Sequence, residues 1–210
     1  MDATVPGGPS PRAVVTADAI PGQTPLDADE LAGLIPGHIT TQEQLNEWEQ
    51  ANILRGQAWG LRQVKRGVRL LDEAFVRELH RRMFDKTWRW AGTFRHSDKS
   101  IGIPWEHIAH RLHQVLGNYE AQIEFKAFPP DELAIRFHRD LVWIHPFPNG
   151  NGRHARLMAD LLVLRLGGER FQWGSRMNLV SAGAAREEYI AALQEGDQGR
   201  FDQLLQFARS

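Results

Sequence analysis

The sequence predicts an all-α fold with one small β-hairpin, and three features support this prediction. Beyond residue 40, apolar residues recur at steps of three to five, as they do along one face of a helix. Residues that favour helix starts and ends flank several of these runs. Residues 88–108 lose the helical period and mix aromatic residues with glycines and a short Ser-Ile-Gly-Ile run. This composition suits a loop with a small hairpin.

The first long helix is expected to begin at Thr40 or Thr41, either of which is a good N-cap, and to bend near Gly56. A second helix should follow the capping residue Asp72. The apolar positions that carry the helical period are Leu45, Trp48, Ile53, Ala58 and Leu61 in the first helix, and Phe75, Leu79 and Met83 in the second.

The next helix should resume near Pro104, after the irregular stretch. Another begins at Pro130 and must stop at His145, because Pro146 disfavours helical geometry in the residue before it. The remaining helices are expected over residues 151–167, where a pair of glycines ends the run, and over residues 186–196 and 200–209.

The chain divides into an N-terminal segment and one domain. Residues 1–36 contain six of the eleven prolines, with glycines among them, and are predicted to be extended. Residues 37–210 are long enough to bury a substantial core and are predicted to form a single domain.

The composition limits the classes of function. The 25 Lys and Arg residues nearly balance the 26 Asp and Glu residues, and a formal charge of −1 gives no overall attraction for nucleic acid or anionic membranes. The absence of cysteine excludes disulfides, thiolate metal sites and cysteine nucleophiles. No apolar run approaches the roughly 20 residues of a membrane span. We therefore expect a cytoplasmic protein without direct nucleic-acid or membrane partners.

The most informative stretch is residues 144–156, Ile-His-Pro-Phe-Pro-Asn-Gly-Asn-Gly-Arg-His-Ala-Arg. Gly150 and Gly152 can adopt positive φ angles, and the helix that starts there offers unpaired N–H groups and the positive end of its dipole. Such a turn forms a nest for an anion. Arg153 and Arg156 lie three residues apart on the same helix, and their planar guanidinium groups suit phosphate oxygens. The stretch therefore predicts a polyphosphate site.

His145 directly precedes this nest. An imidazole with a reference pKa of about 6.5 could accept a proton from an attacking hydroxyl as a general base. Asn149 could help to hold Mg²⁺, although a neutral amide is a weaker ligand than a carboxylate. Taken singly, these residues would suit an ordinary turn, with Phe147 as a core anchor and His154 at the surface or behind the site. Their combination favours the catalytic interpretation.

These residues resemble the signature of the Fic (filamentation induced by cAMP) domain family, H-x-F-x-[DE]-G-N-G-R-x-x-R. It runs here from His145 to Arg156, and seven of its eight defined positions match, the acidic position being Asn149. The stretch from Trp88 to Ile103 also resembles the Trp-Ala-Gly segment and flap hairpin of that family. The resemblance covers roughly residues 40 to 205. Within that family the chain resembles Fic proteins of the GNGR type and is similar to the subgroup called mobile mystery protein B.

The resemblance implies a protein adenylyltransferase that transfers AMP from ATP to a Ser, Thr or Tyr hydroxyl of a target protein, with Mg²⁺ as cofactor. It makes His145 the base, Asn149 the metal ligand and Phe147 the anchor of the loop. The nucleotide-binding residues that it implies are Gly150, Asn151 and Gly152 around the α- and β-phosphates, Arg153 at the β-phosphate, which is also counted as catalytic, and Arg156 at the γ-phosphate. The flap residues that would pair with the backbone of the target are Ser100, Ile101, Gly102 and Ile103.

The resemblance also raises the question of regulation. Many Fic proteins carry a helix whose glutamate pairs with the second arginine of the signature and blocks the γ-phosphate, and no stretch here matches that helix literally. Glu49, on the first long helix, is the inhibitory candidate; the alternative is a solvated acidic helix face. We therefore expect an autoinhibited enzyme, with a regulatory partner protein as a further interaction.

Three alternatives remain open at this stage. A nucleotide-binding interaction module with little or no transferase activity would explain the loss of the acidic residue at Asn149. A Fic enzyme that uses another phosphorylated donor would keep the same cradle. A metal-dependent hydrolase built from His138, His145 and His154 is the third, although their spacing fits no H-E-x-x-H arrangement.

Overall fold

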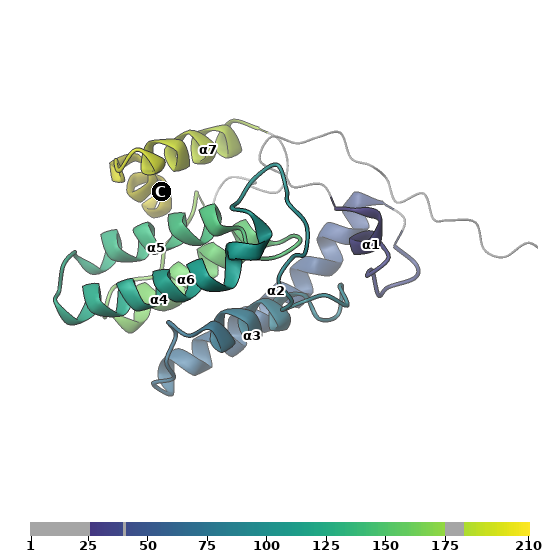
Figure 1. The fold of residues 1–210 in the computed structure, drawn as a ribbon, viewed down its shortest axis with the longest axis horizontal. Coiled ribbons are helices and arrows are strands. Elements are labelled where there is room, and N and C mark those ends of the chain that lie inside the picture. The colour runs from purple at the N-terminus through teal and green to yellow at the C-terminus, as the bar shows by residue number, and fades with distance from the viewer. Residues whose placement is uncertain (1–25, 40, 175–182) are drawn as a thin grey trace, which may run out of the picture.

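The structure is a computed structural model that describes residues 26–39, 41–174 and 183–210. This part of the chain folds into helices joined by loops (Figure 1), which confirms the predicted all-α class. Its elements are α1 (Ala28–Leu31), α2 (Gln42–Lys65), α3 (Glu73–Phe84), the 3-10 helix η1 (Trp105–His107), α4 (Ile108–Glu124), α5 (Pro130–Ile144), α6 (Asn151–Arg165), α7 (Ala184–Asp197) and α8 (Asp202–Arg209).

Side-chain caps confirm two of the predicted helix starts. The Thr41 hydroxyl accepts a hydrogen bond of 3.2 Å from the Gln44 N–H, and the Gln44 side chain accepts one of 3.3 Å from the Thr41 N–H. The Asp72 carboxylate accepts a hydrogen bond of 3.3 Å from the Phe75 N–H at the start of α3. Thr40, the other predicted N-cap, lies outside the described residues.

The glycines of α2 serve helix packing. No break interrupts α2 at Gly56, where the sequence suggested a bend. A Cβ atom on Gly56 would lie 2.6 Å from Cγ of Met83, and one on Gly60 would lie 2.8 Å from Cδ1 of Leu161. The two glycines therefore let α2 approach α3 and α6 more closely than any other residue would.

Helix α6 lies at the centre of the molecule. Its side chains are buried around most of its circumference, so it packs against α5 and α2 and also meets α3. In Figure 1, α4, α5 and α6 run side by side, and α7 lies along one edge of this layer. A second apolar cluster joins α5 and α6 to the C-terminal helices through Ala134, Ile135, Val163, Tyr189, Leu204 and Phe207. Since buried residues occur along α6 from Asn151 to Val163, both ends of this helix are anchored in the core.

The predicted β-hairpin is not confirmed. Residues 93–104 are all described and contain only bends and irregular backbone, without a strand. The β-type pairing found in the described residues is one isolated bridge between Leu34 and Trp88. The stretch is instead a loop, and the buried Arg95 donates hydrogen bonds to two of its carbonyl groups, those of Ser97 and Ile103.

Residues 27–35 form an N-terminal strap across the tryptophan segment. The Ile35 N–H donates to the Thr87 carbonyl at 2.8 Å, and the Arg89 N–H donates to the Gly33 carbonyl at 2.8 Å. The indole of Trp90 donates to the carbonyl of Glu30 at 2.9 Å. This part of the predicted extended segment therefore lies on the domain and includes one helical turn, α1.

The remainder of that segment, residues 1–25, lies outside the described residues. The predicted boundary at residue 36 stays a prediction. Each helix that the structure describes is too short or too polar to cross a lipid bilayer.

Candidate functional site

The signature loop, residues 145–151, joins the end of α5 to the start of α6. His145 ends α5 in the left-handed conformation, with φ 52° and ψ 59°, which confirms that the helix stops before Pro146. Gly150 begins α6 with φ 78°, and a Cβ atom there would lie 2.6 Å from Cζ of Phe84. Both the backbone angle and the lack of space therefore require glycine at position 150.

The side chain of Asn151 holds the loop closed. Its Oδ1 accepts a hydrogen bond of 2.9 Å from the Phe147 N–H, and its Nδ2 donates one of 2.7 Å to the Phe147 carbonyl. Phe147 is fully buried, in agreement with its predicted role as an anchor. Asn151 thus stabilises the turn through its side chain, in addition to the predicted contribution of its backbone to the anion nest.

Two buried histidines lie behind the loop. His80, on α3, contacts the carbonyl of Asn149 through Nε2 at 3.0 Å, and its ring stacks on Phe147 with 3.7 Å between ring centroids. His154 lies 1 % exposed and contacts the carbonyl of Val76 through Nε2 at 2.9 Å. The part of the prediction that placed His154 at the surface is therefore wrong, because its ring fills the space between α6 and α3.

His145 is buried and neutral at physiological pH. Its residue is 7 % exposed, and burial lowers its pKa to about 4, with a further contribution from the positive charge of Arg95 and, last, from that of Lys99. A hydrogen bond to the backbone of Val142 acts in the opposite direction. A neutral imidazole has a free electron pair for a proton, so the protonation state suits a general base.

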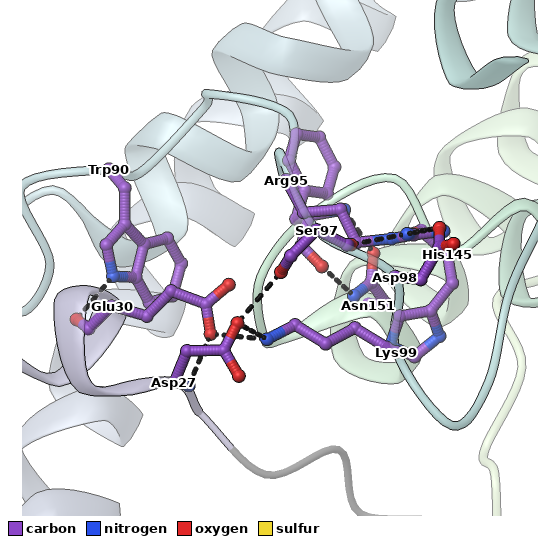
Figure 2. Close-up of polar contacts among 10 residues, drawn as sticks. Asp27, Glu30, Trp90, Arg95, Ser97, Asp98, Lys99, His145 and Asn151 are labelled. Atoms are coloured by element: carbon purple, nitrogen blue, oxygen red, sulfur yellow. Dashed lines mark hydrogen bonds and ion pairs between the residues drawn. The ribbon is translucent and has the colours of Figure 1, made fainter. Parts of the chain in front are cut away.

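Arg95 organises the flap loop, residues 95–103, against His145 (Figure 2). Its buried guanidinium donates to the carbonyl of His145 at 2.8 Å, to that of Ser97 at 2.8 Å, and to that of Ile103. Burial lowers the pKa of Arg95. A Cβ atom on Gly102, where φ is 110°, would lie 2.7 Å from Cβ of His145. The flap loop therefore packs directly on the residue that carries the imidazole.

The N-terminal strap reaches the same loop through ion pairs. Figure 2 shows Lys99 between the two carboxylates of Asp27 and Glu30, and each carboxylate lies 2.7 Å from its Nζ atom. The side chain of Lys99 is only 3 % exposed. The hydroxyl of Ser97 donates to Asp27 at 2.8 Å. The Lys99 ammonium and the Ser97 hydroxyl, which lower the pKa of Asp27, keep that carboxyl ionised.

Arg153, the first arginine of the signature, pairs with Glu49. Its Nη1 lies 2.5 Å from Oε2 of Glu49, and the other carboxylate oxygen accepts a hydrogen bond of 2.7 Å from the indole of Trp88. Glu49 is 4 % exposed. The guanidinium of Arg153 also lies over the ring of Phe84, 5.0 Å from its centroid. Glu49 therefore pairs with the first arginine of the signature, whereas the resemblance implied the second.

The second arginine, Arg156, lies over the ring of Tyr189 at 5.5 Å from its centroid. Arg186 lies one turn earlier on α7. Burial lowers its pKa, and the nearby positive charges of Arg156 and Arg153 lower it further. Three guanidinium groups therefore gather near the start of α6. Because like charges repel, this arrangement favours an anion between them.

The oxygen of Asn149 does not fit a protein-held magnesium site. Its Oδ1 accepts a hydrogen bond of 2.6 Å from the Gly150 N–H and lies 3.4 Å from Nη2 of Arg153, so donors surround it. Magnesium sites in proteins commonly use one or two carboxylates together with phosphate oxygens. We therefore derive no chemical step through a resident metal at Asn149.

The metal-hydrolase alternative is not supported. His138 contacts the hydroxyl of Tyr189 at 2.8 Å, whereas His154 contacts the Val76 carbonyl, so these two rings serve different neighbours. Across residues 26–39, 41–174 and 183–210, no group of three or more His, Asp or Glu side chains is arranged to hold a metal ion.

The sequence analysis missed four residues that shape the site: His80, Arg95, Lys99 and Arg186. His80 lies among the buried residues of α3, next to Leu79 in the sequence. This position among apolar residues is the sequence feature that could have identified it. The remaining three lie in a loop or at the start of a helix, distant in sequence from the signature. The structure does bring together the predicted residues of the signature, the flap and Glu49.

The geometry defines a class of protein: an all-α domain with a buried, neutral histidine beside a helix start at which arginines gather. Residues 70–163 match the family described as Fic/DOC family. Two curated relatives share part of it. One, the Protein adenylyltransferase Fic of Aedes aegypti, is 32 % identical over 96 residues, which is 44 % of this chain and 19 % of that protein.

The second relative, the Protein adenylyltransferase Fic of Nematostella vectensis, is 50 % identical over 38 residues, which is 18 % of this chain and 9 % of that protein. This chain therefore spans less than a fifth of either curated relative. The GNGR type and the mobile mystery protein B subgroup stay predictions.

Solved structures share the fold. Fic-1 (aa134 - 508) from C. elegans superimposes with a TM-score of 0.62 at 23 % identity, covering 86 % of this chain and 51 % of that one. The BepC protein with bound AMPPNP from Bartonella tribocorum has a TM-score of 0.62 at 18 % identity, covering 87 % of this chain and 97 % of that one. At these identities the likeness establishes the fold.

Proposed function

We propose that this chain transfers AMP from ATP to a Ser, Thr or Tyr hydroxyl of a protein. The observation that carries the proposal is a buried, neutral His145 placed directly before an anion-binding helix start with two signature arginines. The two curated relatives named protein adenylyltransferase support the reaction type. The AMPPNP in the BepC structure supports a nucleoside triphosphate as the anion.

In this reaction, the start of α6 and His145 would have different roles. The nest at the start of α6, with Arg153 and Arg156, would bind the phosphates and stabilise the charge that develops on them. The target hydroxyl oxygen would bond to the α-phosphorus while its proton passes to the imidazole of His145. The bond from the α-phosphorus to the bridging oxygen would break, and pyrophosphate would leave. Magnesium would enter with the nucleotide, held mainly by its phosphates.

The flap loop would meet the target protein. Ser100 and Gly102 are exposed, Ile101 is half-buried, and Ile103 is buried beneath them. Backbone pairing along this edge would bring a target hydroxyl in line with the α-phosphorus. The flap has no partner strand among the described residues, so pairing would form only when the target binds.

We further propose that Glu49 is inhibitory. Its carboxylate occupies the Arg153 guanidinium that would otherwise hold a phosphate, and a regulatory partner protein could act by displacing it. Glu49→Gln keeps the acceptor for Trp88 but removes the charge. We expect this variant to bind ATP several-fold more tightly and to modify itself faster. If ATP affinity and self-modification were unchanged, Glu49 would not be inhibitory, and its ion pair with Arg153 would only connect α2 to α6.

The transferase proposal is tested with ATP labelled at the α-phosphate, Mg²⁺ and either the purified protein alone or a cell lysate. We expect label on protein, and a loss of about a hundredfold to ten-thousandfold for His145→Ala with ATP binding retained. His113→Ala is the matched control, because His113 is exposed on α4. Absence of transfer at every magnesium concentration, even from Glu49→Gln, would contradict the proposal.

One alternative has a specific observation in its favour. Asn149 replaces the acidic residue of the signature, which fits a nucleotide-binding interaction module with little or no turnover. If both the wild-type chain and Glu49→Gln bound ATP but transferred no AMP, this result would favour the interaction module. Transfer from a different labelled phosphorylated donor would identify a Fic enzyme with another substrate. The cytoplasmic location stays a prediction.

A further inference from the structure

We propose that His80 is a positioning residue that locks the peptide bond between Asn149 and Gly150, so that the Gly150 N–H faces the anion site. The inference rests on the proposed function, because it assumes that a phosphate binds at the start of α6. It assigns a role to a residue that lies on α3, outside the signature, and that would touch no part of the substrate.

The hydrogen bonds of His80 identify its tautomer. The N–H of Gly92 donates to Nδ1 of His80 at 3.0 Å, so this nitrogen has no proton. The proton of the neutral ring must therefore be on Nε2, which lies 3.0 Å from the Asn149 carbonyl and donates to it. His80 is fully buried, and burial, which is the main cause, lowers its pKa well below the usual value. The ring therefore stays neutral and keeps its donor toward the loop.

A trans peptide unit points its C=O and N–H groups in opposite directions. When the Asn149 carbonyl points into the core toward His80, the Gly150 N–H must point outward. The observed contacts agree: this N–H donates to Oδ1 of Asn149 at 2.6 Å, and the same oxygen lies 3.4 Å from Nη2 of Arg153. One neutral oxygen thus occupies the point where two donors converge, as a phosphate oxygen would.

The Asn149–Gly150 pair needs such a lock. Glycine is the residue that tolerates both orientations of the preceding peptide, since its φ angle can be positive or negative. A reversed peptide would point the Asn149 carbonyl into the anion site and repel the phosphate. The lock itself is rigid, because the ring of His80 stacks on the buried Phe147 at an interplanar angle of 19°.

A purely structural role is the competing explanation, and a matched pair of variants separates the two. The amide of glutamine reaches the position of Nε2, so His80→Gln keeps the donor for the Asn149 carbonyl and loses the acceptor for Gly92. The shorter asparagine places its amide near Nδ1, so His80→Asn keeps the Gly92 contact and loses the Asn149 contact. His154→Asn serves as the control, since it removes the hydrogen bond from an equally buried histidine to the Val76 carbonyl.

The experiment measures the affinity for AMPPNP by calorimetry and the stability by urea unfolding, for the whole chain and each variant. We expect His80→Asn to weaken binding about tenfold, the usual size for one lost hydrogen bond, while His80→Gln stays within about twofold of the wild type. His154→Asn should lose stability without this loss of affinity. In the wild type, nitrogen NMR should find the His80 proton on Nε2.

Two results would overturn the lock. One is equal nucleotide affinity in His80→Asn and His80→Gln; the other is a loss of affinity that follows the loss of stability in all three variants. If the wild type binds no nucleotide, the proposed function fails, and crystals of His80→Asn then decide the lock separately. A reversed Asn149–Gly150 peptide in those crystals would support it, and an unchanged peptide would overturn it.

Discussion

The signature loop and the flap loop form two sides of the same site but are held by different kinds of interaction. The signature loop depends on neutral, buried contacts: the two hydrogen bonds of Asn151 and the stacked ring of His80. The flap loop depends on charged side chains, the buried guanidinium of Arg95 and the ammonium of Lys99. Part of its support comes from the N-terminal strap, far away in sequence.

The difference corresponds to what each loop would do. A cradle for phosphate works best when its donors are fixed before the ligand arrives, because no reorganisation is then needed during the reaction. A loop that meets a protein backbone must adapt to its partner. The pair between Lys99 and Asp27 suits that purpose, because the Asp27 side chain is more than half exposed and salt weakens such a pair more than it weakens buried neutral hydrogen bonds. Four predictions use this contrast.

Acid should weaken the signature-loop side first, and this is the largest effect that we expect. Burial lowers the pKa of His145 and His154 to about 4 and that of His138 to about 3. The unfolded chain binds protons on these rings near pH 6.5, so the free energy of unfolding falls as the pH drops below that value. Between pH 6.5 and pH 5 the three histidines together should cost about 5 kcal/mol of unfolding free energy.

Urea unfolding at several pH values measures this loss. The strap should behave differently, because the pKa of Asp27 is lowered from 3.8 and its carboxylate therefore stays ionised until the pH falls below that value. Its contribution is present above that pH and is lost below it. A free energy of unfolding that is constant between pH 6.5 and pH 5 would contradict the histidine argument.

Removing the arginine of the flap loop should have the next largest effect. Arg95→Met leaves three carbonyl groups without their buried donor, which should cost about 3 kcal/mol of unfolding free energy. Arg77→Met is the control, because Arg77 is partly exposed and donates to a single carbonyl, that of Gly92. Equal losses in the two variants, measured by urea unfolding, would mean that Arg95 does not organise the loop.

Asn151→Ala tests the neutral side. It removes both hydrogen bonds to Phe147 and leaves a buried N–H and a buried C=O unpaired, so we expect a loss of about 2 kcal/mol. The matched control is Asn118→Ala on the exposed surface of α4, which should change stability by less than about 0.5 kcal/mol. The Asn151 effect should not depend on salt, and a strong salt dependence would show that the contrast between the two loops is wrong.

The smallest effect should come from the ion pairs of the strap. Lys99→Met removes the contacts with Asp27, which is more than half exposed, and with Glu30. Methionine removes a buried charge that had to be desolvated, and Asp27 can regain water, so we expect a change of less than about 1 kcal/mol in global stability. Amide hydrogen exchange of the flap residues should nevertheless become faster, as it should for the wild type in high salt. Unchanged exchange at Ser100–Ile103 in both experiments would show that the strap does not support the flap.

The fold and much of the site could be predicted because their signals are local. Apolar periodicity places α2 to α8, the caps Thr41 and Asp72 mark helix starts, and Pro146 ends α5. The signature concentrates a histidine, two glycines and two arginines within twelve residues, so one turn brings them together. Interactions between neighbouring residues are the part of a structure that a single sequence reveals most directly.

The remaining features depend on contacts between distant segments. The hairpin was predicted from the loss of the helical period and from the Ser-Ile-Gly-Ile run, but Arg95 binds the carbonyl groups of Ser97 and Ile103 and holds the stretch as a loop. Glu49 was identified as a candidate, yet its pairing with Arg153 depends on how α2 lies against α6. No pattern within the sequence reports the distance between such helices.

The left-handed backbone at His145 has a consequence for any attempt to stabilise this protein by design. A residue with a side chain is held there at a cost of about 1 kcal/mol or more relative to glycine. Glycine at this position would relieve the backbone but remove the imidazole, so stability and the proposed chemistry make opposite demands on one residue.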